Sequence, residues 1–250
     1  MNKNIHDYYE DDFTEKNYLE LIIKAKQNYD FILYKEVDSY KKFVLWRHDV
    51  DFSVHRAVKL AKIEKSQNVK ATYFIMLTSN FYNIFEVEIK EKILKIVELG
   101  HDIGLHFDPS PYNINNEADL IKWLKYEKET IENLLGINIS VFSFHNPTVG
   151  NISTNNSIKY AGMINTYSKN FFDTIKYCSD SNGYWRYERL ESLLLENAYD
   201  KLQILTHPVW WVETSMKARD RVLLAVKGRF ENQIKSYDQL LYENGRVNVK

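Results

Sequence analysis

Hydrophobic and polar residues follow two repeating patterns along most of this chain. Short apolar runs, typical of buried strands, are followed by longer stretches with apolar residues every three or four positions, which is the spacing of one helix face. The first such stretch, residues 14–27, follows this helical spacing behind Thr14, which can cap a helix. We therefore expect a helix at 14–27 and an alternation of strands and helices after it.

This alternation continues almost to the end of the chain. The expected strands are 42–51, 70–79, 101–108, 137–147, 163–168, 174–180 and 201–207. The expected helices after the first are 54–67, 86–100, 116–136, 189–199 and one near 214–242. Helices long enough to cross over between strands favour a parallel sheet in an α/β fold. Because no Pro/Gly/Ser-rich linker interrupts the chain, we expect one domain over 1–250, with the helix 14–27 packed on it.

Composition narrows the range of partners. The 33 basic and 34 acidic residues give a net charge of −1, so charge offers no argument for binding nucleic acid or an anionic membrane. The sequence contains no uninterrupted run of about 18 apolar residues, so it does not predict a membrane-spanning segment. The first residues lack the apolar core of an export signal. The single cysteine, Cys178, cannot form an internal disulfide. We expect a cytoplasmic protein with a small-molecule partner, and the sequence does not indicate its oligomeric state.

Polar residues gather where the expected strands end. The residues that share this position are Asp49, Asp51, His106, Asp108, His145, Asp180 and His207. In a parallel barrel the carboxyl ends of the strands share one face, and that face carries the active site. Separate stretches of the sequence therefore point to one site.

Alternation along a strand sorts the first of these stretches, VLWRHDVDFS (44–53). Residues two apart lie on the same face, with Cα atoms roughly 6.5 Å apart. Arg47, Asp49 and Asp51 therefore share one face, and His48 lies on the other. We expect both carboxylates to face the barrel interior and His48 to pack outward under the helices.

Carboxylate and imidazole groups together suit a divalent ion such as zinc, whose catalytic sites use three protein ligands and an open position. Asp51 and His106 are the first candidates for ligands. A second carboxylate beside the ion could act as general base, a role that fits Asp49. His207 could protonate a leaving group at neutral pH.

Each of these residues also has a purely structural interpretation. Asp51 could cap the helix that follows it. A lone histidine on an apolar strand is more often a hydrogen-bonded core residue than a ligand. Trp210 and Trp211, with Trp185 and Tyr184, could fill the core as readily as stack on a sugar.

Five motifs resemble those of the NodB-type polysaccharide deacetylases of carbohydrate esterase family 4 (CE4), which remove N- or O-acyl groups from sugars. The motifs are RHDVD (47–51), GHDIGLH (100–106), SFHNP (143–147), SDSNGYWR (179–186) and LTHP (205–208). They are most similar to a divergent branch found in O-antigen and capsule gene clusters. The resemblance implies a distorted (β/α) barrel with about seven parallel strands.

The resemblance also implies roles for individual residues. Asp49 takes the place of the catalytic base, Asp51 and His106 those of metal ligands, and His207 that of the general acid. The residues expected to contact substrate are Asp108, Asp180, Trp185, Arg186 and Trp210.

Two positions depart from the family pattern. Ser110 stands where the second motif has another histidine, and His145 stands in place of an arginine that holds the catalytic aspartate. The third metal ligand would then be His145 or Asp108. We favour His145, because an imidazole there lies next to the carboxylate strand and two ligands would hold zinc poorly.

Together with these residues, the resemblance implies a metal-dependent hydrolase, with zinc as the expected ion, that removes an acetyl or formyl group from the nitrogen of a sugar or a sugar-linked intermediate. The expected substrate is a nucleotide-linked or lipid-linked sugar intermediate of surface polysaccharide biosynthesis. Two alternatives remain open. One is a metal-free amidase on the same fold, and the other is a non-catalytic sugar-binding or scaffold protein.

Overall fold

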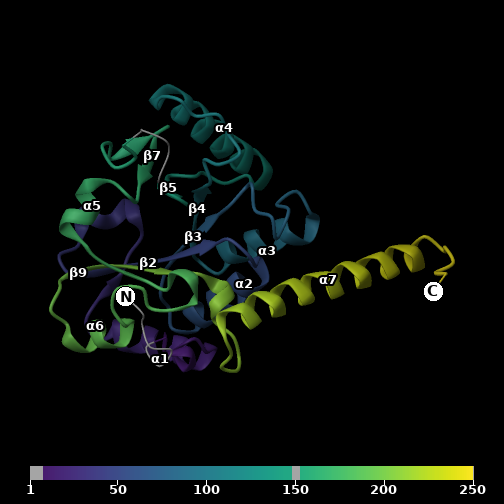
Figure 1. Ribbon diagram of the computed structural model, residues 1–250, viewed down its shortest axis with the longest axis horizontal. Helices are drawn as coiled ribbons and strands as arrows, with labels where there is room; N and C mark the ends of the chain where they lie inside the picture. Colours follow the sequence, from purple (N-terminus) through teal and green to yellow (C-terminus); the bar gives the residue numbers. More distant parts are fainter. Residues whose placement is uncertain (1–7, 148–152, 250) are drawn as a thin grey trace.

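A curved sheet forms the centre of the computed structural model, which describes residues 8–147 and 153–249 (Figure 1). The strands are β1 (Asp30–Phe31), β2 (Phe43–Val50), β3 (Thr72–Ile75), β4 (Asp102–Phe107), β5 (Val141–Phe144), β6 (Lys159–Tyr160), β7 (Met163–Asn165), β8 (Lys176–Ser179) and β9 (Lys201–Thr206). Their order across the sheet is β6-β7-β5-β4-β3-β2-β9-β8, and β1 pairs with β2 off this path.

Seven consecutive strands of this order, from β7 to β8, pair in parallel, whereas β6 joins β7 antiparallel. Within the described residues β7 and β8 do not pair with each other, so the sheet curls into a half-barrel and does not close. The predicted α/β fold, a distorted barrel with about seven parallel strands, is confirmed.

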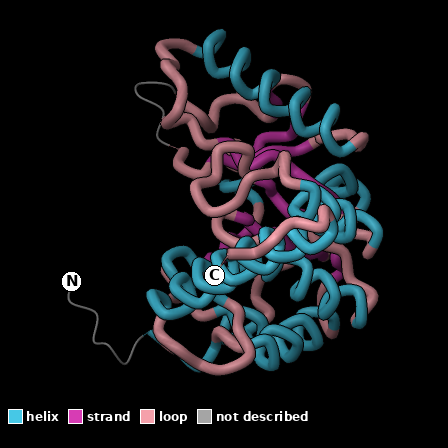
Figure 2. Tube along the Cα trace, turned by 90° about the vertical axis from the view of Figure 1, so that its right-hand side faces the viewer, coloured by secondary structure: helices cyan, strands magenta, loops and turns pink. Residues whose placement is uncertain are grey.

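Helices cover the outside of this sheet (Figures 1 and 2). They are α1 (Glu15–Lys26), α2 (Val54–Ser66), α3 (Val87–Glu98), α4 (Glu117–Leu135), α5 (Lys169–Thr174), α6 (Leu190–Glu196) and α7 (Ala218–Glu243). The sequence pattern predicted all of them except α5, within a few residues at most ends. It missed β1 and β6, which have only two residues each, and α5, whose six residues make fewer than two helical turns and so show no helical period. Within the described ranges no helix has both the length and the apolar character that crossing a membrane requires.

Local sequence determines where the helices begin and end. Thr14 caps α1 by accepting a hydrogen bond from the Asn17 N–H, and Ser53 caps α2 in the same way. Because Ser53 caps α2, the interpretation of Asp51 as the cap of this helix is wrong. Gly136 ends α4 in the left-handed region, at φ 68°.

Strand β2 lies between β3 and β9, and all eight of its residues are buried. His48 is on its outer face, as expected. The Nε2 atom of His48 lies 2.6 Å from Glu64 Oε1 of α2, and its Nδ1 lies 2.7 Å from Thr206 Oγ1. His48 is therefore a hydrogen-bonded core residue that ties the sheet to α2.

A buried carboxyl group in α4 predicts a dependence of stability on pH. Glu127 is fully buried, and its Oε1 accepts a hydrogen bond from the Tyr112 hydroxyl. Burial raises the pKa of Glu127 to about 8. Between the ordinary pKa of roughly 4.3 and about 8, the folded protein keeps a proton that the unfolded chain has lost. The free energy of unfolding therefore decreases as the pH rises through this range, and the stabilising contribution is gone above about 8.

We expect the Glu127→Gln variant, which cannot lose this proton, to gain stability relative to the wild type between pH 5 and pH 9. The gain should be on the order of a few kcal/mol. Urea unfolding at the two pH values measures it. Glu129→Gln, an exposed position in the same helix, is the control. An identical pH dependence in the wild type and Glu127→Gln would contradict the prediction.

Candidate active site and metal group

The candidate site lies at the carboxyl ends of the central strands. Asp49 lies at the end of β2 and Asp51 directly after it. His106 comes from β4, His145 from the segment after β5, and His207 from the segment after β9. Asp51 is in the middle of this set. Its carboxylate oxygens lie 3.0 Å from His106 Nε2, 3.7 Å from His145 Nδ1 and 3.7 Å from His207 Nε2. The expectation that these separate stretches meet at one face is met by the structure.

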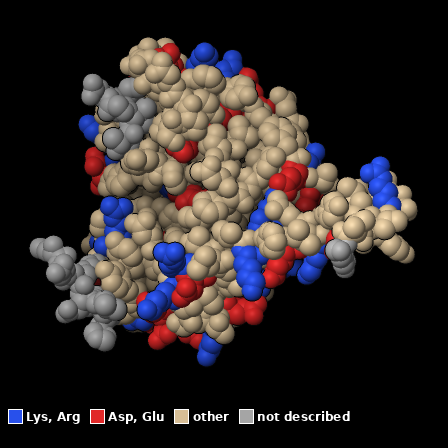
Figure 3. All heavy atoms as spheres, turned by 45° about the vertical axis from the view of Figure 1, so that its right-hand side comes forward, with Lys and Arg blue, Asp and Glu red and all other residues tan. Residues whose placement is uncertain are grey.

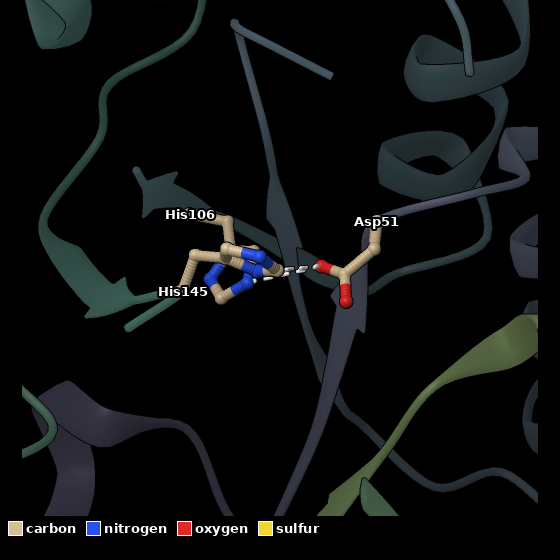
Figure 4. Close-up of side chains that lie close together, drawn as sticks. All are labelled: Asp51, His106 and His145. Carbon is tan, nitrogen blue, oxygen red and sulfur yellow. Dashed lines mark ion pairs between the residues drawn. The ribbon is translucent and has the colours of Figure 1, made fainter. Parts of the chain in front are cut away.

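Three of these residues form a group that could hold a divalent metal ion. Asp51, His106 and His145 each offer one ligand atom, and these atoms lie within 4.8 Å of one another. Figure 4 shows both imidazoles turned toward the Asp51 carboxylate. A carboxylate with two imidazoles is a common donor set for a catalytic metal that keeps an open position.

The surroundings of the three side chains fit such an ion. Asp51 Oδ1 is buried, and although His106 lies close to it, the oxygen has no partner in hydrogen-bond geometry among the described residues. His106 Nδ1 is engaged with Ser143 Oγ at 2.7 Å, which leaves Nε2 directed at Asp51. Burial alone would raise the pKa of Asp51, but the neighbouring imidazoles, His106 foremost, hold it well below its usual range. The carboxylate is therefore ionised and available as a ligand.

Asp108, the other candidate for the third ligand, is not in this group. Its carboxylate accepts hydrogen bonds from the backbone N–H and the hydroxyl of Ser110, both at 2.9 Å. These two hydrogen bonds hold Asp108 in the loop after β4. Ser110, which makes them, stands at the position where the family pattern has a histidine.

Asp49 is held by an arginine from its own strand. Arg47 Nη2 lies 2.7 Å from Asp49 Oδ2 and 2.9 Å from Oδ1, and Arg47 Nε lies 3.2 Å from Oδ1. Arg47 also donates to Thr166 Oγ1 at 3.0 Å, and its guanidinium lies over the Phe74 ring. Burial would raise the pKa of Asp49, but the positive charge of Arg47, together with the neighbouring imidazoles of His106 and His207, keeps the pKa below its usual value. Asp49 is therefore ionised although it is buried.

This pairing accounts for one departure from the family pattern. Arg47 makes the contact that the resemblance assigns to an arginine of the third motif, where this chain has His145. The spacing of two residues places Arg47 and Asp49 on the same face of the strand, and this spacing is the sequence signal for their pairing.

His207 is oriented by Asp180. His207 Nδ1 lies 2.6 Å from Asp180 Oδ1, and its backbone N–H donates to the same carboxylate at 3.0 Å. Trp211 Nε1 donates to Asp180 Oδ2 at 3.0 Å. Burial would lower the pKa of His207, but the Asp180 carboxylate raises it to about 9. The imidazole is therefore protonated at neutral pH, and Nε2 faces the site.

The five residues expected to contact substrate have different surroundings. Arg186 is exposed and lines a pocket of about 820 Å³ that also includes His145. Asp108 is half-buried in its loop, and Asp180 is fully buried behind His207. Trp210 is 6% exposed, with its ring centroid 6.5 Å from that of His207.

Trp185 lies in the core. It is 4% exposed, stacks on Phe13 and donates its indole N–H to Asp12 at 2.8 Å. The structure therefore gives Trp185 no open ring face for a sugar. The motif SDSNGYWR alone does not show whether Trp185 lies in the core or stacks on a sugar. The contacts that place it in the core are made by Phe13 and Asp12, which are far from it in the sequence.

Comparisons with known proteins give a likeness of fold. No protein-family model matches the chain, and no curated protein matches it. Among solved structures, the CE4 domain of a multidomain xylanase from the hindgut metagenome of Trinervitermes trinervoides is 16% identical. The match covers 84% of this chain and 93% of that domain, with a TM-score of 0.45.

Two further structures show a comparable likeness. The chitin deacetylase of the fungal pathogen Colletotrichum lindemuthianum is 16% identical over 74% of this chain and 81% of its own, with a TM-score of 0.41. A CE4 family pseudoenzyme from Bacillus anthracis is 15% identical over 76% of this chain, with a TM-score of 0.43. This chain spans 62% of the pseudoenzyme's length. The chain is thus structurally similar to CE4 proteins at low identity, and its placement in the O-antigen and capsule branch stays a prediction.

Proposed function

We propose that this protein is a metal-dependent hydrolase that removes an N-acyl group, acetyl or formyl, from a sugar. The observation that supports this proposal is the meeting of three prearranged units at one edge of the sheet. These units are the possible metal group of Asp51, His106 and His145, the ionised Asp49, and the protonated His207.

Asp51, His106 and His145 would hold the ion, which when bound polarises an acyl carbonyl and makes a water molecule more acidic. Asp49 Oδ2 lies 3.7 Å from His106 Nε2, so a buried, ionised carboxylate borders the metal group. Asp49 can accept a proton from the attacking water, and its ion pair with Arg47 fixes its orientation. His207 carries the proton that the departing sugar amine needs. One base and one acid in opposite protonation states therefore border the same group.

The finer parts of the proposal concern the ion, the substrate and the setting. A carboxylate with two imidazoles favours zinc. The pocket beside His145 includes Tyr167, Tyr177 and the exposed Arg186, which suit a sugar ring and an attached phosphate. This supports a nucleotide-linked or lipid-linked sugar of surface polysaccharide biosynthesis as the substrate. We place the reaction in the cytoplasm, a setting that suits a chain whose single cysteine, Cys178, is buried and unpaired.

Metal binding tests the proposed ligands. We expect the wild type to bind one zinc ion, and His145→Ala to bind it at least about a hundredfold more weakly because two ligands remain. Equilibrium dialysis followed by metal analysis measures both. His55→Ala, which removes a surface histidine paired with Glu88, is the matched control and should bind zinc normally. If His145→Ala retains the full metal content, the assignment of His145 is wrong.

Removal of the metal tests the reaction. We expect acyl release from one member of a panel of acylated sugars, including UDP-N-acetylglucosamine, to stop on treatment with EDTA and to return with zinc. Release that survives the chelator would indicate a metal-free amidase. Binding of a sugar without any acyl release across the panel would indicate a sugar-binding protein.

A further inference from the structure

The C-terminal helix α7 begins against the body of the protein and then extends away from it (Figure 1). Its 26 residues make it roughly 39 Å long. Arg229 pairs with Glu86, and Asn232 donates to Glu88. In the described part of the chain, the hydrogen bonds of α7 beyond Asn232 stay within the helix and the residues that follow it. The second half of α7 therefore projects without support.

Apolar side chains form a stripe along this helix, at intervals of three or four residues. The stripe consists of Leu223, Val226, Phe230, Ile234, Tyr237 and Leu241. At about 100° per residue these positions lie within about 80° of one another, on the side opposite Arg221, which contacts the body, and next to the side of Arg229. Phe230 is 61% exposed and Tyr237 is 55% exposed. An isolated helix is only marginally stable in water, and a continuous exposed apolar patch is typical of an interaction surface.

The stripe is nearly symmetric about position 232, and this symmetry identifies its partner. When the helix is paired with an antiparallel copy of itself, Leu223 comes opposite Leu241 and Phe230 opposite Ile234. Val226 comes opposite Tyr237 within one residue. A surface that matches its own reverse fits a second copy related by a two-fold axis.

Charge follows the same symmetry. The first half, residues 218–230, has four basic residues and one acidic residue, whereas the second half, 231–243, has three acidic residues and one basic residue. On one flank of the stripe, Lys227 of each copy would come opposite Asp238 of the other within one residue. Antiparallel packing thus places the basic half of each helix beside the acidic half of the other. It also places the positive end of each helix dipole beside the negative end of the other, which is favourable.

A hollow on the other flank of the stripe can receive the projecting end of the second copy. The hollow has a volume of about 430 Å³ and is lined in part by Phe81, Val226 and Phe230. Phe85 and Val87, which flank the lining residue Glu86 in the sequence, are 59% and 72% exposed. The projecting end of α7 shows mainly uncharged surface in Figure 3. We propose that α7 binds a second copy of this chain through the stripe, as an antiparallel helix pair with two-fold symmetry.

Sedimentation equilibrium of the full chain over about 1 to 100 µM tests this pairing. We expect a mass of twice 29.8 kDa for the wild type. Phe230→Glu should raise the dissociation constant at least about a hundredfold, because the change places a charge in the stripe of both copies. The matched control is Tyr242→Glu, which replaces an even more exposed aromatic residue of the same helix that lies off the stripe. It should leave the dissociation constant unchanged.

A charge exchange tests the antiparallel arrangement. Lys227→Glu and Asp238→Lys should each raise the dissociation constant about tenfold, because each creates two like-charge contacts, and the double variant should restore it. Circular dichroism checks that each variant keeps its helix. A monomer at every concentration, or a dimer that Phe230→Glu does not weaken, would overturn the proposal. A monomer that co-sediments with phosphatidylglycerol vesicles would instead assign the stripe to a lipid surface.

Discussion

Replacement of Asp49 by asparagine is expected to lower the turnover of acyl release roughly a hundredfold to ten-thousandfold. The amide is nearly the same size as the carboxylate but cannot accept a proton from the attacking water. Asp49 lies outside the group formed by Asp51, His106 and His145, so the variant should bind metal as the wild type does. Steady-state kinetics and metal analysis on the same preparation separate the two properties.

The control for Asp49→Asn is Asp102→Asn, which changes a carboxylate at the amino end of β4, far from the carboxyl edge. It should leave turnover unchanged. Retained turnover in Asp49→Asn would refute the assignment of Asp49 as the base. Loss of metal together with turnover would instead make Asp49 part of the metal site.

Replacement of Arg47 by methionine is expected to destabilise the folded protein by roughly 3 to 5 kcal/mol. The Arg47 side chain is fully buried and that of Asp49 is 2% exposed, so the variant leaves a carboxylate without its counter-charge in the core. Removal of both charges in Arg47→Met/Asp49→Asn should recover most of this loss, because no uncompensated charge then remains buried. Guanidinium unfolding of the wild type, the two single variants and the double variant measures the coupling.

The control for this pair is an exposed one on α4. Lys125→Met breaks the ion pair between Lys125 and Glu129, which are 66% and 56% exposed. This change should lower the free energy of unfolding by less than about 1 kcal/mol. If Arg47→Met costs no more than this control, the buried pair does not stabilise the fold. A double variant less stable than either single variant would show that Arg47 acts through packing on Phe74 and not through charge.

Strand β2 shows how much the sequence could predict. Its apolar run identified a buried strand, and alternation placed Asp49 and Asp51 on the inner face and His48 on the outer one. The shared edge of a parallel sheet then brought His106, His145 and His207 toward the same place. These steps depend on local periodicity and on topology, and both can be inferred from a single sequence.

Other features depend on contacts between distant segments, which a single sequence does not contain. Asp180 lies behind His207 because both its oxygens are engaged by His207 and Trp211. Trp185 is a core residue because Asp12, 173 positions away, accepts its N–H. The pairing of Arg47 with Asp49 depends on side-chain conformations that alternation does not determine. The shared face was therefore predictable, but the task of each residue on it was not.

The position of Arg47 has a consequence for how this site can vary. Since the counter-ion of Asp49 comes from the same strand, the orientation of the carboxylate does not depend on the segment after β5. Position 145 therefore does not need to supply a cation for Asp49, and it carries an imidazole that reaches Asp51. Insertions or substitutions in that segment would change metal affinity while leaving the carboxylate in place. The proposed third ligand, His145, and the proposed base, Asp49, thus lie on different segments of the chain, so position 145 can change without removing the counter-ion of Asp49.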